Sequence, residues 1–224
     1  MKICAIIPSG GIGSRFNSPI PKQYIKVLGK ELIVYTLQTF QNCKEISEII
    51  IPAHESYFDL LNLIKKENNF SKISKIVHGG KERQDSVYNG IIAGDFEAND
   101  LIAVHDAARP LLSKTLLEKA INLARNFDSV VVGIKARDTL FNADDIVSHY
   151  IDRSKIYYAQ TPQIFRFRIL KKAFDLAFEK GFSGTDESML VKNAGFDIKV
   201  VDGEFENFKI TSKSDLETFK KLIF

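Results

Sequence analysis

The sequence predicts an α/β protein in three layers, with a mostly parallel central sheet, helices on both faces and a protruding β-arm. Apolar strand-like runs alternate along the chain with longer segments of helical spacing. The runs are almost continuously apolar, which is typical of parallel strands that are buried on both faces. The alternation breaks once, between residues 137 and 165, where short strand-like pieces at 139–141, 146–151 and 156–159 accompany a polar turn at 142–145.

The first part of the chain supplies the regular elements. The predicted strands cover residues 3–7, 46–52, 73–78, 101–105 and 129–134. The helices between them present four apolar faces: Leu32, Tyr35, Thr36 and Phe40; Leu60, Leu61, Ile64 and Lys65; Val87, Ile91 and Ile92; Leu116, Leu117, Ala120, Ile121 and Ala124. Ser113 precedes the last face and is a favourable N-cap residue.

The second part is less regular. After the break we expect a helix over 167–178, a loop with Gly181 and Gly184, a helix from about Asp186, a strand near 198–201 and a closing helix after Thr211. No repeat or linker interrupts the chain, so we expect one domain over residues 1–224 with the arm inserted at about 137–160. The residues alone leave open whether that arm covers the sheet edge or reaches a partner subunit.

Composition excludes several classes of protein. The 224 residues are 45% apolar, which supports a packed core, and the net charge of +3 argues against general nucleic-acid binding. Only Cys4 and Cys43 are present, which fits a reducing compartment and a cytoplasmic location. The N-terminal apolar run ends early in Pro-Ser-Gly-Gly, so we expect neither a signal peptide nor a membrane span.

The segment after the first strand, PSGGIGSRFNSPIPKQY at residues 8–24, predicts an anion site. It holds three glycines and two cations: Gly10, Gly11, Gly13, Arg15 and Lys22. The spacing matches neither the dinucleotide nor the P-loop pattern. Backbone N–H groups of such a loop form an anion cradle, whose charge the two cations would complement. A plain glycine turn is less favoured, because Pro21 fixes the backbone just before the lysine.

Two further segments follow strands. VHDAARP at 104–110 places Asp106 at the carboxyl end of a strand, where it can hold Mg²⁺, accept hydrogen bonds from sugar hydroxyls or simply cap a turn. We expect its neighbour His105 to be a packed polar residue. By itself, HGGKERQDSV at 78–87 is typical of an ordinary connection from a strand through a turn to a helix, with Arg83 and Asp85 as solvated charges.

Polar groups beside the later strands supply cations and hydroxyls for a second anionic ligand. They are Arg137-Asp138-Thr139, Asp152-Arg153, Gln160-Thr161-Pro162-Gln163 and Lys209-Ile210-Thr211.

With these motifs in this order, the chain resembles the nucleotidyltransferases, and among them the 2-C-methyl-D-erythritol 4-phosphate cytidylyltransferase family of the non-mevalonate isoprenoid pathway. The resemblance covers nearly the whole chain and also includes Asn207-x-Lys209-x-Thr211. There are two departures. The family often has Ala-Ala-Gly where this chain has Ser9-Gly10-Gly11, and it often has an acidic residue where Lys81 stands.

The resemblance implies a Rossmann-like fold and transfer of CMP from CTP to a sugar-alcohol phosphate. It also implies that Mg²⁺ or another divalent cation takes part, held mainly by the CTP phosphates, and we assign no protein residue as a metal ligand. It also implies a homodimer formed through the arm. The implied catalytic residues are Arg15 and Lys22. The implied CTP-binding residues are Ser9, Gly10, Gly11, Gly13, Gly80, Lys81, Ser86 and Asp106. Those implied for the methylerythritol phosphate are Asp106, Arg109, Thr139, Arg153, Thr161 and Lys209.

Three alternatives stay open. A ribitol-5-phosphate cytidylyltransferase shares the chemistry but tends to have His-Asp-Ser-Val-Arg-Pro where this chain has His-Asp-Ala-Ala-Arg-Pro. A dinucleotide-dependent dehydrogenase is disfavoured by the glycine spacing and gives Lys22 no function. A nucleotide-sensing module without catalysis would not need Arg15 and Lys22 together.

Overall fold

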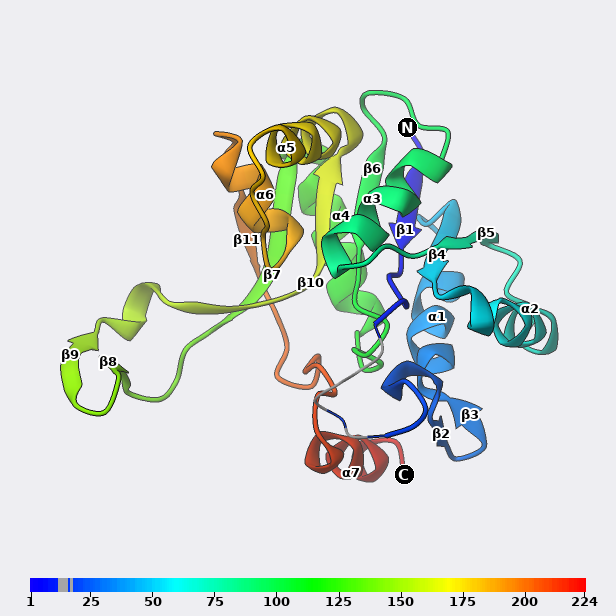
Figure 1. Ribbon diagram of the computed structural model, residues 1–224, viewed down its shortest axis with the longest axis horizontal. Helices are drawn as coiled ribbons and strands as arrows, with labels where there is room; N and C mark the ends of the chain where they lie inside the picture. The colour runs from blue at the N-terminus through cyan, green and yellow to red at the C-terminus, as the bar shows by residue number, and fades with distance from the viewer. Residues whose placement is uncertain (12–15, 17) are drawn as a thin grey trace.

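A seven-stranded sheet organises the protein in the computed structural model, which describes residues 1–11, 16 and 18–224 (Figure 1). The strand order is β11-β7-β10-β6-β1-β4-β5. Neighbouring strands are parallel except for β10, which is antiparallel to both β6 and β7. The mostly parallel sheet is therefore confirmed. Its strands are β1 (Ile3–Ile6), β4 (Glu48–Ala53), β5 (Ile73–His78), β6 (Leu101–Val104), β7 (Ser129–Lys135), β10 (Tyr157–Arg166) and β11 (Lys199–Asp202).

Strand β1 shows why helices cover both faces of the sheet. Its side chains alternate between two hydrophobic cores, with Ile3 and Ala5 in one and Cys4 and Ile6 in the other. The first core is closed by α1 (Leu32–Asn42), α2 (Phe58–Glu67) and α4 (Lys114–Asn126), and the second by α3 (Arg83–Ala93), α5 (Phe167–Glu179) and α6 (Glu187–Asn193). This arrangement confirms the three layers.

A third, smaller core lies below the carboxyl end of the sheet. There α7 (Lys213–Leu222) packs through Leu216 and Phe219 against Val27 of a short hairpin, β2 (Lys26–Val27) and β3 (Lys30–Glu31). No helix among residues 1–11 and 18–224 is long and apolar enough to cross a membrane. Both cysteines are buried and unbonded to each other.

The order of the strands creates a crevice between β1 and β6. The chain builds outward from β1 through β4 to β5, then returns through α3 to place β6 on the other side of β1. At such a reversal the loops that follow the two central strands leave in opposite directions, and ligands bind between them. Gly10 and Gly11 follow β1, and Asp106 follows β6.

Strand β10 is longer than the sequence indicates, because the expected short strand at 156–159 continues to Arg166. Its pairing with β7 shifts register between Ala159 and Gln163, which leaves Pro162 in a bulge where no ladder N–H is needed. Buried polar side chains interrupt the apolar pattern that marks the other strands: Gln160, Thr161 and Gln163.

Helix α3 begins at Arg83, so Ser86 lies within its first turn rather than before the helix. A reciprocal capping box starts it, in which the Asp85 carboxylate accepts a 3.0 Å hydrogen bond from the Glu82 N–H. Asp85 is therefore a cap rather than a solvated charge. The expected apolar face is right for Val87 and Ile91, which are buried, and wrong for Ile92, which is 57% exposed.

The arm leaves the sheet between β7 and β10 and projects away from the body of the molecule (Figure 1). It is an antiparallel hairpin of β8 (Leu140–Ala143) and β9 (Val147–Ile151). Phe141, Ile146 and Tyr150 are 53%, 82% and 69% exposed, so the hairpin does not cover the sheet edge with its apolar side chains. The protruding β-arm is confirmed, whereas the assignment of residues 1–224 to one domain stays a prediction.

The contact between α3 and the sheet provides a test of the fold. A Cβ atom on Gly90 would lie 2.8 Å from Ile6 Cγ2 and 2.9 Å from Pro52 Cγ. We expect Gly90→Ala to lower the free energy of unfolding by about 1–2 kcal/mol, because overpacking costs about 1–3 kcal/mol and alanine returns at most about 1 kcal/mol of helix propensity. Denaturant unfolding measures this change. Ile92→Ala on the same helix is the control, and we expect it to change stability by about 0.5 kcal/mol or less. Equal stability of Gly90→Ala and the wild type would contradict the packing described.

Candidate active site

A cavity of about 720 Å³ lies at the crevice between β1 and β6. Separate parts of the chain form its walls, namely the loop after β1, the turn at residues 22–23, His54 after β4, the loop after β5, residues 106–108, and Lys209 with Thr211. Eight of the residues predicted to bind ligand line it: Gly10, Gly11, Lys22, Gly80, Lys81, Ser86, Asp106 and Lys209. Gly13 and Arg15 lie outside the described residues.

The turn that carries Lys22 is fixed to the glycine loop. The Gln23 side-chain amide donates hydrogen bonds to the carbonyls of Ser9 (2.8 Å) and Gly11 (2.9 Å). Tyr24 Oη lies 2.8 Å from Ser9 Oγ. These contacts hold Lys22 on the cavity wall. Ser9 itself is buried and does not line the cavity, so its side chain supports the loop.

The loop after β5 depends on Gly80 and Ser86. The Gly80 N–H donates to Ser86 Oγ at 2.9 Å, and that hydroxyl donates to the Glu82 carbonyl at 3.0 Å. A Cβ atom on Gly80 would lie 2.1 Å from Asp85 Cβ, so only glycine fits there. The backbone of this loop therefore forms one wall of the cavity, and Lys81 extends from it as an exposed cation.

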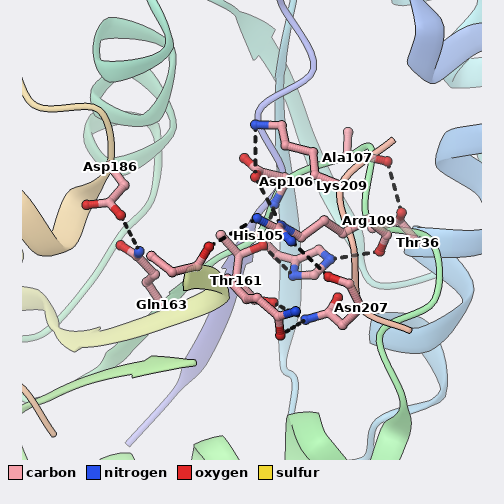
Figure 2. A network of polar contacts seen from close by, with 12 residues as sticks. Thr36, His105, Asp106, Ala107, Arg109, Thr161, Gln163, Asp186, Asn207 and Lys209 are labelled. Atoms are coloured by element: carbon pink, nitrogen blue, oxygen red, sulfur yellow. Dashed lines mark hydrogen bonds and ion pairs between the residues drawn. The ribbon is translucent and has the colours of Figure 1, made fainter. Parts of the chain in front are cut away.

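Asp106 is the central charge of the site, because three cations surround its buried carboxylate. Oδ1 accepts a hydrogen bond from Arg83 Nε at 3.1 Å. Oδ2 lies 3.3 Å from Arg109 Nε and 3.1 Å from Lys209 Nζ (Figure 2). Burial by itself would raise the pKa of Asp106, but the positive charges of Arg83, Lys209 and Arg109 outweigh it and hold the pKa well below its usual value. The carboxylate is thus ionised throughout the physiological range.

A neutral histidine fixes the backbone at Asp106 (Figure 2). His105 Nε2 lies 3.1 Å from the Arg109 carbonyl oxygen, which can only accept, so Nε2 carries the proton. Nδ1 then accepts from the Thr161 hydroxyl at 3.0 Å, and that hydroxyl oxygen accepts from the Asp106 N–H at 3.1 Å. Burial lowers the pKa of His105 to about 4, which keeps the ring neutral. The prediction that His105 is a packed polar residue is consistent with its full burial.

Arg109 and Thr161 lie behind Asp106 and do not line the cavity. Arg109 Nη1 donates to the Asn207 carbonyl at 2.8 Å, and Asn207 Nδ2 donates to the Thr161 carbonyl at 2.8 Å. Both residues orient Asp106 and the segment that carries Lys209. Their direct contact with a sugar phosphate stays a prediction.

Thr139 and Arg153 lie on the arm, exposed, and do not line the cavity of their own chain. The Arg153 guanidinium donates to the Arg137 carbonyl at the base of the arm. Arg137 in turn stacks on Phe205, with 3.4 Å between its guanidinium carbon and the ring centroid. Their place in a substrate site therefore stays a prediction.

Two residues of the site were not predicted to act there. Arg83, expected to be a solvated charge, instead joins Asp106 to Glu187, whose two carboxylate oxygens accept from its Nη1 and Nη2 at 2.7 and 3.1 Å. Glu187 begins α6 and is only 1% exposed. Arg83 belongs to the HGGKERQDSV segment at 78–87, whereas Glu187 belongs to none of the motifs described above.

The neutral His105 predicts a pH dependence of stability. Its pKa falls from 6.5 in the unfolded chain to about 4 in the folded protein, so the unfolded state binds more protons between these values. Its contribution is complete above pH ~6.5 and is lost as the pH falls toward ~4, by up to about 3 kcal/mol. We expect the stability advantage of the wild type over His105→Gln to shrink by that amount between pH 7.5 and 4, as measured by urea unfolding. A constant difference across this range would contradict a buried neutral imidazole.

The fold and the cavity together are those of a nucleotidyltransferase, because a glycine loop and a set of cations meet at the crevice of a parallel sheet. The profile of the family described as IspD, 2-C-methyl-D-erythritol 4-phosphate cytidylyltransferase, matches residues 3–223. The chain belongs to this family of enzymes.

Relatives of known sequence and structure agree with that assignment. Proteins named 2-C-methyl-D-erythritol 4-phosphate cytidylyltransferase from Clostridioides difficile and Caldanaerobacter subterraneus are 39% and 37% identical to this chain. The alignments cover 97% and 96% of this chain and 92% and 96% of theirs. The crystal structure of 4-diphosphocytidyl-2C-methyl-D-erythritol synthase from Anaerococcus prevotii superposes with a TM-score of 0.85 at 30% identity, covering 99% of this chain and 98% of that one. The cytidylyltransferase from Francisella tularensis gives 0.83 at 30% identity, covering 99% of both chains.

Proposed function

We propose that this chain transfers CMP from CTP to 2-C-methyl-D-erythritol 4-phosphate and releases pyrophosphate. The observation that carries the proposal is the cavity between β1 and β6, where the glycine-loop backbone faces Lys22, Lys81 and Lys209. Both substrates are anions, and each of their phosphate groups carries about −1 to −2 charges. A cavity that joins them must compensate this charge, and the one observed has cations on three sides.

The reaction exchanges one phosphorus–oxygen bond for another. A phosphate oxygen of the sugar alcohol attacks the α-phosphorus of CTP, and the bond between the α-phosphorus and the oxygen that bridges to the β-phosphorus breaks. Pyrophosphate takes the electron pair. Positioning and charge stabilisation carry catalysis in such a transfer, so no protein nucleophile is required. Lys22 follows the glycine loop and lines the cavity beside it, and we assign it, with Arg15, to the developing charge.

Asp106 is suited to hydroxyl groups rather than to a metal ion. Each of its oxygens already accepts from a cation, and the lone pairs that remain can accept from ribose or sugar hydroxyls. Among the residues that the structure describes, Cys43, Glu45 and Glu118 are the one group with spacing suited to a metal, and none of them lines the cavity. We propose that Mg²⁺ or another divalent cation is held mainly by the CTP phosphates.

We further propose a homodimer in which the arm of one chain completes the site of the other. A two-stranded hairpin is marginal by itself, and its exposed Phe141, Ile146 and Tyr150 need a surface to cover them. A two-fold dimer would use the same pair of surfaces twice and create two shared sites. The free cysteines are compatible with the reducing cytoplasm, where we place the enzyme.

Pyrophosphate release with a panel of substrates tests the reaction. We expect turnover with CTP and 2-C-methyl-D-erythritol 4-phosphate, and slower turnover with ribitol 5-phosphate, ATP or GTP. The glycine backbone at Gly10, Gly11 and Gly80 lines the cavity, and we expect it to leave little room for a purine base. Equal kcat/KM with ATP would overturn the base assignment. A preference for ribitol 5-phosphate would instead support the related cytidylyltransferase.

Subunit exchange tests the arm. Lys22→Ala should lower kcat by about 10²–10³-fold, as loss of one charge-stabilising group does, and Arg153→Ala should weaken the sugar-phosphate site. If the arm acts in trans, a mixed dimer of the two variants holds one site with both defects and one with neither. Activity then recovers toward about half the wild-type value per mixed dimer. If mixing restores nothing after exchange has been verified, or if the protein is monomeric at assay concentration, the shared-site proposal is wrong.

A further inference from the structure

The buried carboxylate of Glu187 is linked through Arg83 to Asp106, the central charge of the site. Both oxygens of Glu187 accept hydrogen bonds from Arg83, at 2.7 Å from Nη1 and 3.1 Å from Nη2. This two-point contact fixes the plane of the guanidinium group as well as its position. Glu187 has almost no exposure to solvent, so its place in the structure depends on this partner.

The third N–H of the same guanidinium group reaches Asp106. Arg83 Nε donates to Oδ1 at 3.1 Å, whereas Arg109 and Lys209 both lie on Oδ2. Arg83 thus holds the other carboxylate oxygen, Oδ1. Because the guanidinium group is rigid and planar, its two-point contact with Glu187 sets the direction from which Nε meets the carboxylate.

Glu187 is itself held against the central sheet. Asp186 caps α6 by accepting from the Met189 N–H at 2.9 Å. The Gln163 side chain of β10 donates to Asp186 Oδ2 at 2.9 Å (Figure 2) and accepts from the Ser188 N–H at 2.8 Å. The start of α6 therefore sits in a fixed place beside β10, the strand that also carries Thr161.

We propose that Glu187 is a positioning residue for the transfer reaction, which acts through Arg83 to orient the Asp106 carboxylate toward the hydroxyl groups of the bound substrate. The inference rests on the proposed function, since it assumes that Asp106 receives substrate hydroxyls. Glu187 does not line the cavity and contacts no substrate. Its effect reaches the reaction only through the path from Glu187 to Arg83 to Asp106.

Steady-state kinetics of Glu187→Gln tests the proposal. The substitution keeps the shape of the side chain but removes the charge that holds two N–H groups of Arg83. We expect kcat to fall by about 10–100-fold, because misplacement of a positioning group by about 1 Å has effects of that size. The KM for CTP should change by less than about threefold, because a lost alignment of Asp106 acts mainly on the transition state rather than on the bound ground state. Glu179→Gln, an exposed carboxylate at the end of α5, is the matched control and should retain wild-type kinetics.

A double-mutant cycle separates positioning from a general loss of structure. Glu187 and Asp106 share Arg83 as a partner, so their effects should not add. In an Asp106→Asn background, Glu187→Gln should lower kcat by less than about twofold further. A purely structural defect would instead lower activity by the same factor in both backgrounds, and that result would overturn the proposal.

The shorter Glu187→Asp keeps the measurement informative if Glu187→Gln does not fold. It retains the charge but cannot span both N–H groups from the same backbone position, so we expect an intermediate loss of kcat of about 3–10-fold. Wild-type kcat in Glu187→Gln, or in Glu187→Asp when that is the variant that folds, overturns the positioning role alone. A wild-type enzyme that fails to release pyrophosphate from CTP with any sugar-alcohol phosphate overturns the proposed function, and the inference with it.

Discussion

The site depends on one buried carboxylate that is ionised because three cations surround it. Without Arg83, Arg109 and Lys209, burial would drive Asp106 toward its neutral form, and without Asp106 three positive charges would face one another. Each cation comes from a different element: the start of α3, the turn after β6 and the segment before α7. The carboxylate therefore joins three parts of the fold that are far apart in the sequence.

The same cluster explains why so much of the site is buried support rather than open surface. His105 and Thr161 determine where the Asp106 backbone lies, and Arg109 ties it to the Asn207 carbonyl. Lys22, Lys81 and Lys209 then line the cavity itself. Lys209, which its ion pair with Asp106 holds in place, can meet an anionic ligand without a large change in geometry, which lowers the cost of reorganisation during the reaction.

The sequence predicted the parts of this structure that follow from local pattern. Apolar periodicity located the parallel strands, and the position of Asp106 at a strand end located the crevice. The prediction ended β10 too early because Gln160 and Thr161, the next residues, are polar and look like the end of a strand. Both side chains are buried and hydrogen-bonded to distant parts of the chain, which the local sequence does not reveal. Arg83 and Glu187 are 104 positions apart, and nothing local marks such a pair. The sequence shows that the arm carries apolar side chains. Whether a second chain covers them depends on how two molecules associate, which the local pattern of one chain does not describe.

The central position of β1 has a consequence for the order in which the protein is made. Its partners in the sheet are β4 and β6, so Cys4 pairs with Glu48 on one side and with Ile102 on the other. During synthesis this wholly apolar strand leaves the ribosome before the other strands of the sheet, and neither hydrogen-bonded neighbour exists until the chain has grown to it. Pairings of such long sequence separation form slowly, because the intervening chain must first be ordered. Until β4 and β6 are made, both edges of β1 stay unpaired and its apolar side chains stay uncovered, which is the condition under which nascent chains associate wrongly.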